Sequence, residues 1–199
     1  MSGEPDDGDG DRDDGRADGD GELVVLLDDD GRETGTMAKL AAHRGDGRLH
    51  RAFSVFLVDR SGRLLLQRRA STKHHFQDLW SNACCSHPRP GEPVPAAGAR
   101  RLRDELGVEL LPADLAEVGS FTYRARDERS GLVEHEHDHV LLGRFDGDPR
   151  PDPDEVGDWR WIEPGRLRRE LATDPGRFTP WLSPALDVLG RIDEAPHGR

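Results

Sequence analysis

The sequence has few of the residues that crosslink small secreted proteins or anchor proteins in membranes. Among 199 residues there are only two cysteines, Cys84 and Cys85, and neighbouring cysteines form a poor structural disulfide. No apolar run reaches the length of about 18 residues that a membrane-spanning helix needs. The acidic N-terminus lacks the basic and apolar regions of a signal peptide. We therefore expect a cytoplasmic protein without a membrane partner.

Lysine is also scarce. The chain contains 26 arginines but only two lysines, Lys39 and Lys73. A bias of this size indicates that arginine replaces lysine wherever either residue serves. The two remaining lysines are therefore candidates for positions that need a compact point charge in place of a planar guanidinium group.

The net charge of −12 is concentrated at one end of the chain. Residues 1–21 contain eight Asp, one Glu and two Arg, with six glycines and almost no apolar side chains. Because such a segment can bury little surface, we predict a disordered acidic tail at residues 1–21 and a single domain at residues 22–199. The tail has no specific pattern that favours a binding arm. So acidic a protein is not expected to bind nucleic acid.

Short apolar runs and one amphipathic segment predict the elements of the domain. A helix should begin at Pro95, carry Ala99, Leu102 and Leu106 on one face, and be followed by one or two helices near the C-terminus. Gly107 should end it as a C-cap. This mixture is typical of an α/β (mixed α+β) sandwich. Strands are expected at residues 23–27, 52–58, 63–67, 80–86, 116–123 and 132–145 and at the Trp159/Trp161 alternation.

The segment 82–88 combines cysteine and histidine. On a strand, alternation puts Cys85 and His87 on one face and Cys84 on the other. One cysteine should then face a site and the other the core. The alternative is that both are small buried apolar side chains, which is common for free cysteine.

The segment 132–139 combines glutamate and histidine. In an extended chain Glu134 and Glu136 project together, with His135 and His137 on the opposite face. Two adjacent carboxylates are unfavourable unless a cation or a proton neutralises them. A solvated strand edge with alternating charge is the alternative interpretation. The histidines after Glu136, among them His139, are expected to face solvent.

Three isolated histidines complete a possible ligand set. With the two glutamates, they would form a five-ligand site of nitrogen and oxygen atoms if the fold brings them together. Such a set suits Mg²⁺, Mn²⁺ or Zn²⁺. Spacing alone does not establish that they converge. The five residues are His43, His50, His87, Glu134 and Glu136.

Residues 86–108 resemble the Nudix signature. Two positions depart from that pattern, because Arg101 and Asp104 replace glutamates that Nudix hydrolases use for metal. Arginine pairs with phosphate but does not bind a cation, so a metal cluster for diphosphate hydrolysis is partly dismantled. The positions that correspond to the signature are Ser86 (in place of its first glycine), Glu92, Arg100, Leu102, Glu105, Gly107 and Val108.

The resemblance extends from about residue 23 to residue 181. Taken together, these stretches are similar to the type 1 isopentenyl diphosphate isomerase family, which has a Nudix-type α/β/α sandwich with a mixed sheet and a central helix. The resemblance implies interconversion of isopentenyl diphosphate and dimethylallyl diphosphate by protonation and deprotonation, with a small prenyl diphosphate as partner. We expect a monomer. The matching stretches are residues 34–36, 39–43, 49–53, 67–70, 73, 80–88, 123–125, 131–136 and 178–181.

The resemblance also assigns roles to individual residues. It implies that Cys85 and Glu136 are the catalytic pair, with Tyr123 and Trp181 lining the pocket. One divalent metal, Mn²⁺, Mg²⁺ or Zn²⁺, is implied at the five His and Glu residues, and Glu105 is implied in a Mg²⁺ that arrives with the substrate. Both lysines then fall at substrate-binding positions. The residues implied in diphosphate binding are Lys39, Arg69, Lys73 and Arg101.

Two other functions fit parts of the sequence. A Nudix diphosphohydrolase is the main alternative, but Arg101 counts against it and Cys85 would have no role. A metal-buffering protein would use the His and Glu cluster but leave both lysines unexplained. Residues 74–76, His-His-Phe, replace a more aromatic stretch of the family, which bears on the shape of the pocket but not on the expected chemistry.

Overall fold

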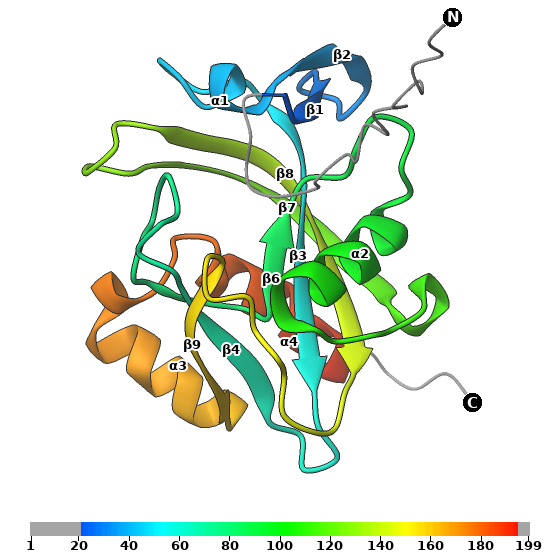
Figure 1. Ribbon diagram of the computed structural model, residues 1–199, viewed down its shortest axis with the longest axis vertical. Helices are drawn as coiled ribbons and strands as arrows, with labels where there is room; N and C mark the ends of the chain where they lie inside the picture. The colour runs from blue at the N-terminus through cyan, green and yellow to red at the C-terminus, as the bar shows by residue number, and fades with distance from the viewer. Residues whose placement is uncertain (1–20, 195–199) are drawn as a thin grey trace, which may run out of the picture.

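Strand β3 (His50–Val58) lies at the centre of a mixed sheet (Figure 1). It pairs in parallel with β8 (Val133–Arg144) along its whole length and antiparallel with β6 (Cys84–Ser86). The computed structural model describes residues 21–194, so the predicted tail, up to residue 20, lies outside the described residues. The other elements are β1 (Leu23–Leu27), β2 (Glu33–Ala38), α1 (Lys39–Ala42), β4 (Leu64–Arg69), β5 (Trp80–Ser81), α2 (Val94–Leu106), β7 (Ala116–Arg126), β9 (Val156–Ile162), α3 (Pro164–Thr173) and α4 (Leu182–Glu194), with 3₁₀ turns at Pro112–Asp114 and Pro175–Arg177.

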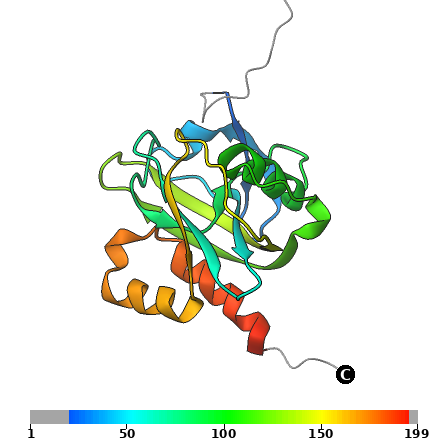
Figure 2. The ribbon, with the colours of Figure 1, turned by 60° about the horizontal axis from the view of Figure 1, so that its bottom comes forward.

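Helices cover both faces of the sheet, with α2 on one side and α3 and α4 on the other (Figure 2). The odd-numbered side chains of β3, such as Phe53 and Val55, belong to the core under α2. Phe56, on the opposite face, belongs to the core under α3 and α4. This alternation confirms the predicted α/β sandwich with a mixed sheet.

Helix α2 follows the predicted pattern closely. Leu102 and Leu106 are fully buried and Ala99 is nearly so, as their 3–4 spacing predicts. Gly107 ends the helix in the left-handed conformation at φ 61°, which favours glycine. Replacing Leu102 by alanine is expected to cost about 2–5 kcal/mol of folding free energy, because the cavity would lie in the middle of the core.

The observed strands differ from the expected ones in two places. The strand expected at residues 80–86 is divided into β5 and β6 by Asn82 and Ala83, and the Asn82 side chain donates to the Val55 carbonyl at 3.2 Å and to the Cys84 carbonyl at 2.6 Å. Strand β2 was not expected, because its sequence contains Thr and Gly without an alternation of apolar residues. Its side chains are accordingly mostly exposed. It forms by antiparallel pairing with β1.

Candidate active site and metal centre

Five buried side chains converge at the start of β3 and β8. They come from four separate segments, since His43 follows α1, His50 begins β3, His87 follows β6, and Glu134 and Glu136 lie on β8. One ligand atom from each lies within 4.8 Å of all the others. The structure thus brings together the whole ligand set that the sequence suggested. Such a group of imidazole and carboxylate ligands can bind a divalent metal.

Backbone pairing explains why the segments meet. In the parallel register of β3 and β8, His50 is opposite Glu136. The Val133 amide donates to the His43 carbonyl at 2.8 Å and attaches the end of α1 to the start of β8. Alternation along β8 then turns both glutamates to the same face.

Two of the histidines are oriented as metal ligands usually are. The Nδ1 atoms of His43 and His50 lie 2.6 Å from the Lys39 carbonyl and 2.7 Å from the Arg48 carbonyl. A carbonyl can only accept, so each Nδ1 carries a proton and each ring turns its Nε2 atom toward the centre, where it can bind a cation.

Nitrogen and oxygen atoms lie close together at the centre of this group. The Nε2 atoms of His50 and His87 are 3.1 Å apart, and His87 Nε2 is 2.9 Å from Glu136 Oε1. His43 Nε2 is 2.7 Å from Glu134 Oε2. Lone pairs at these distances repel unless a proton or a cation lies among them, so the donor set fits a bound divalent cation.

Charge and burial separate the two glutamates. Burial alone would raise the pKa of Glu134, but His75 and His43 hold that pKa well below its usual value. Burial and the nearby Glu134 carboxylate raise the pKa of Glu136. Burial lowers the pKa of His43, yet the Glu134 carboxylate reverses this shift and raises the pKa to about 9. Glu134 is therefore the more readily ionised of the two, and Glu136 is the one that binds a proton more readily.

Cys85 and Tyr123 present protonated groups on the same face of the sheet. Tyr123 is opposite Glu136 in the β7–β8 register, and its hydroxyl donates to Glu136 Oε2 at 2.6 Å. Burial and Glu136 raise the pKa of Tyr123 well above its usual value. Burial raises the pKa of Cys85 to about 12 although Arg69 opposes the shift, so Cys85 is a thiol at neutral pH. Cys84 is fully buried in the core under α2, on the other face.

Trp181 forms an aromatic wall beside these groups. Its indole N–H lies 3.1 Å from Ser81 Oγ and 3.2 Å from an oxygen of Asn82, which fixes the ring. The ring centroid is 5.3 Å from that of Phe76 and 6.0 Å from that of Tyr123. The result is a buried apolar surface next to the polar centre.

The cationic side chains implied in diphosphate binding are held by carboxylates and carbonyls. Lys73 forms an ion pair with Glu155, and Arg101 lies 3.2 Å from the same carboxylate and 2.7 Å from that of Glu105. Lys39 lies 2.9 Å from Glu22. Glu105 is buried beside Arg101 but is not part of the five-residue group. Arg69 donates to the carbonyls of residues 75 and 76.

Three residues of this region were not identified from the sequence. His75 contacts Glu134, and Glu155 joins Lys73 to Arg101. Both lie in segments whose composition indicates a loop, so no periodicity marked them. Asp138 is buried on the Glu136 face and accepts from Ser54 Oγ at 2.8 Å. The alternation of glutamates along β8 could have indicated it.

The histidines on the other face of β8 have different partners. The His139 ring lies 2.7 Å from Glu117 and the His137 ring 3.0 Å from the Thr122 hydroxyl. Both rings are half-buried, so the expectation that they face solvent is only partly met.

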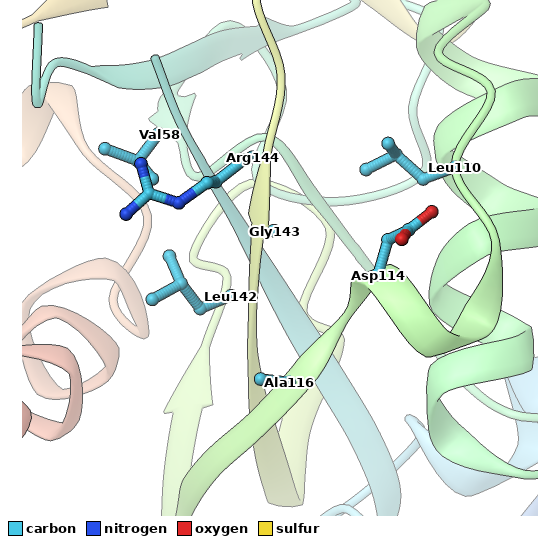
Figure 3. A pocket seen from close by; sticks show the side chains of 7 residues that line it. All are labelled: Val58, Leu110, Asp114, Ala116, Leu142, Gly143 and Arg144. Atoms are coloured by element: carbon cyan, nitrogen blue, oxygen red, sulfur yellow. The ribbon is translucent and has the colours of Figure 1, made fainter. Parts of the chain in front are cut away.

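A surface hollow elsewhere carries no comparable chemistry (Figure 3). It is lined by Val58, Leu110 and Arg144 among others. Val58 ends β3, at the opposite end of the strand from His50, which corresponds to a separation of roughly 26 Å at about 3.3 Å per residue. None of the predicted site residues lines it. Among the described residues, no helix is both long and apolar enough to cross a membrane.

Comparison with solved structures supports the fold. The structure resembles that of DR0079 from Deinococcus radiodurans with a TM-score of 0.61 and 22% identity, covering 76% of this chain and 89% of that one. It also resembles a MutT protein from Methanosarcina mazei with a TM-score of 0.58 and 16% identity, covering 75% of this chain and 96% of that one.

Comparison with known sequences is more specific. Residues 48–182 match the NUDIX domain family. A protein from Nocardia farcinica named isopentenyl-diphosphate Delta-isomerase is 53% identical over 176 residues, which are 88% of this chain and 99% of that protein. A protein of the same name from Halorhodospira halophila is 49% identical over 162 residues, covering 81% of this chain and 91% of that protein. The chain belongs to the isopentenyl-diphosphate Delta-isomerase family of NUDIX-domain proteins.

Proposed function

We propose that this chain interconverts isopentenyl diphosphate and dimethylallyl diphosphate at the centre formed by Cys85, Tyr123 and Glu136. The observation that carries the proposal is the arrangement of two proton-bearing sites, the half-buried Cys85 thiol and the Tyr123–Glu136 pair, on one face of the sheet, with Trp181 beside Tyr123. Moving an unactivated double bond needs an acid, a base and a dry pocket between them.

The proton balance of the reaction requires two positions. One proton is added to the terminal methylene carbon, which leaves a tertiary carbocation, and one proton is lost from the methylene carbon on the other side. Cys85 and Glu136 divide these two transfers, and their roles exchange in the reverse direction. The Tyr123 hydroxyl, which donates to Glu136, holds that carboxyl in one orientation.

The aromatic wall stabilises the charge that develops in between. A carbocation needs electron density without a nucleophile that would trap it. The Trp181 ring is fixed by its N–H contacts to Ser81 and Asn82 and can offer its face to the cation. A desolvated cation–π contact of this kind contributes roughly 2 kcal/mol.

The metal centre and the cationic side chains supply the positive charge of the site. A divalent cation, Mn²⁺, Mg²⁺ or Zn²⁺, supplies positive charge when bound at the five His and Glu residues and offsets the repulsion among their lone pairs. Lys73 and Arg101 both contact Glu155, so the two cations lie close enough together to bind one diphosphate group. We assign Lys39 and Arg69 to the same role, and Glu105 to a Mg²⁺ that arrives with the substrate.

We also propose that the protein acts as a monomer in the cytoplasm. Among the described residues, the large apolar side chains that are exposed are Leu23, on β1, and Leu111, in a loop after α2, and two such residues make up less than the apolar patch that a stable dimer would bury. Light scattering on the purified protein would measure the oligomeric state directly.

Product analysis tests the main proposal. Purified protein incubated with isopentenyl diphosphate and Mg²⁺ should give dimethylallyl diphosphate without releasing phosphate. In deuterated water the label should enter the carbons that gain and lose protons. Chelation of metal should stop the reaction, and added Mn²⁺, Mg²⁺ or Zn²⁺ should restore it. Phosphate release from a diphosphate substrate, with no deuterium in the prenyl chain, would instead establish a diphosphohydrolase.

A further inference from the structure

We infer that His75 is a sixth functional residue of the metal centre, a positioning residue that holds Glu134 in the orientation in which it binds the cation. The inference rests on the proposed metal-dependent function. His75 is buried, and its Nε2 atom forms a hydrogen bond with Glu134 Oε1. Its ring centroid lies 5.4 Å from that of His43.

The two oxygens of Glu134 have separate partners. Oε2 lies 2.7 Å from Nε2 of His43, a member of the five-residue group, whereas Oε1 forms a hydrogen bond with His75. With its Nδ1 proton committed to the Lys39 carbonyl, His43 would give its Nε2 lone pair to a bound cation and would then have no proton to donate to Glu134. His75 is the neighbour that can donate. A donor on the second oxygen fixes the plane of a ligating carboxylate and leaves the first oxygen for the cation.

His75 is itself held in place by the backbone around it. The Arg69 guanidinium donates to the His75 carbonyl at 3.0 Å and to the Phe76 carbonyl at 3.1 Å. The Phe76 amide donates to the Asp127 carboxylate at 3.2 Å. Phe76 has φ 51°, an unfavourable conformation for a residue with a side chain, which persists because these contacts determine it. The imidazole is therefore presented to Glu134 by a rigid segment.

The geometry favours a positioning role over direct ligation. The five converging residues do not include His75, and its Nε2 forms a hydrogen bond with Glu134 Oε1, the oxygen that is not bonded to His43. Arg69, which anchors the segment, also lies beside Cys85 and Trp181. The segment thus connects the metal centre to the pocket where the substrate is proposed to bind.

Metal affinity measures this role without depending on turnover. The test compares the dissociation constant for Mn²⁺ of the full chain with that of His75→Leu, by electron paramagnetic resonance of the unbound ion. Loss of a partner that orients a metal ligand weakens metal binding by roughly 10- to 100-fold. His75→Gln, which keeps an N–H at a similar reach, should recover most of the affinity. His75→Asn, whose amide is too short to reach Glu134, should not.

A matched control is available on β8, the strand that carries Glu134. His137→Leu removes a half-buried histidine from the opposite face of β8 and should leave Mn²⁺ affinity unchanged. Thermal unfolding in a chelator should show that His75→Leu and the wild-type apoprotein fold alike. Isomerisation by His75→Leu should recover as Mn²⁺ is raised, which a general structural defect would not do.

Two outcomes would overturn the inference. In the first, His75→Leu binds Mn²⁺ as tightly as the wild type and His137→Leu do. If His75→Leu does not fold, the same result for His75→Asn counts. The other is wild-type protein that binds no Mn²⁺, which would also end the metal-centre proposal. Affinity that depends on His75 in a protein that fails to isomerise would instead uphold the inference and refute only the proposed reaction.

Discussion

Tyr123→Phe isolates the contribution of one hydroxyl group to catalysis. The substitution removes the donor that lies 2.6 Å from Glu136 Oε2 and leaves the ring, whose centroid is 5.6 Å from that of Phe121 and 6.0 Å from that of Trp181. The pKa of Tyr123 is raised well above its usual value by burial and Glu136, so the hydroxyl remains a donor throughout any practical pH range. The perturbation is thus the loss of one part-buried hydrogen bond while the shape of the ring is kept.

The size of the effect follows from the partners. A hydrogen bond to a charged group contributes about 1.5–3 kcal/mol, and about 1.4 kcal/mol corresponds to a factor of ten. If the bond orients Glu136 in the transition state, kcat should fall by roughly 10- to 150-fold while KM changes little, because Tyr123 is not assigned to diphosphate binding. Steady-state conversion of isopentenyl diphosphate, followed by product analysis, measures both constants.

Stability should respond as well. Glu136 is buried, and the substitution leaves its Oε2 atom without this donor, so the melting temperature of the apoprotein should decrease. Phe121→Leu serves as the control, since it alters the neighbouring ring and keeps the hydroxyl. A Tyr123→Phe protein with the kcat of wild type would refute the role given to the Tyr123–Glu136 pair.

Three further predictions concern Cys85, Cys84 and Arg101. Cys85→Ala should abolish isomerisation. Cys84→Ala, in the core under α2, should keep its activity and lower the melting temperature by about 2–4 °C. The opposite pattern of activity would reverse the assignment of the two cysteines. Because the pKa of Cys85 is raised to about 12, the reactive thiolate is scarce at neutral pH, and alkylation followed by mass spectrometry should accelerate up to at least pH 10. A rate that levels off near pH 8 would contradict the raised pKa of Cys85. Arg101→Glu places a third carboxylate beside Glu105 and Glu155 and should raise KM by roughly 10-fold or more without creating a hydrolase; phosphate release by this variant would show that Arg101 alone separates the two activities.

Local chemistry determined the features that depend on neighbours in sequence. Alternation along a strand separated Cys84 from Cys85 and put Glu134 and Glu136 on one face, because side chains of a strand repeat every two residues wherever the strand lies. The end of α2 at Gly107 was predicted for the same reason, since a left-handed C-cap is a property of the backbone at that residue.

Contacts between distant segments were decided only by the tertiary structure. The parallel register that places His50 opposite Glu136 depends on how β3 and β8 pair, and no local pattern specifies it. The resemblance to a family indicated that the five ligands belong together, but not which side chains surround them. His75 and Glu155 lie 59 and 82 residues from the partners that give them a role, Glu134 and Lys73. A histidine or a glutamate in a loop has no periodicity to mark it, so its function depends on what the fold brings within reach of its side chain.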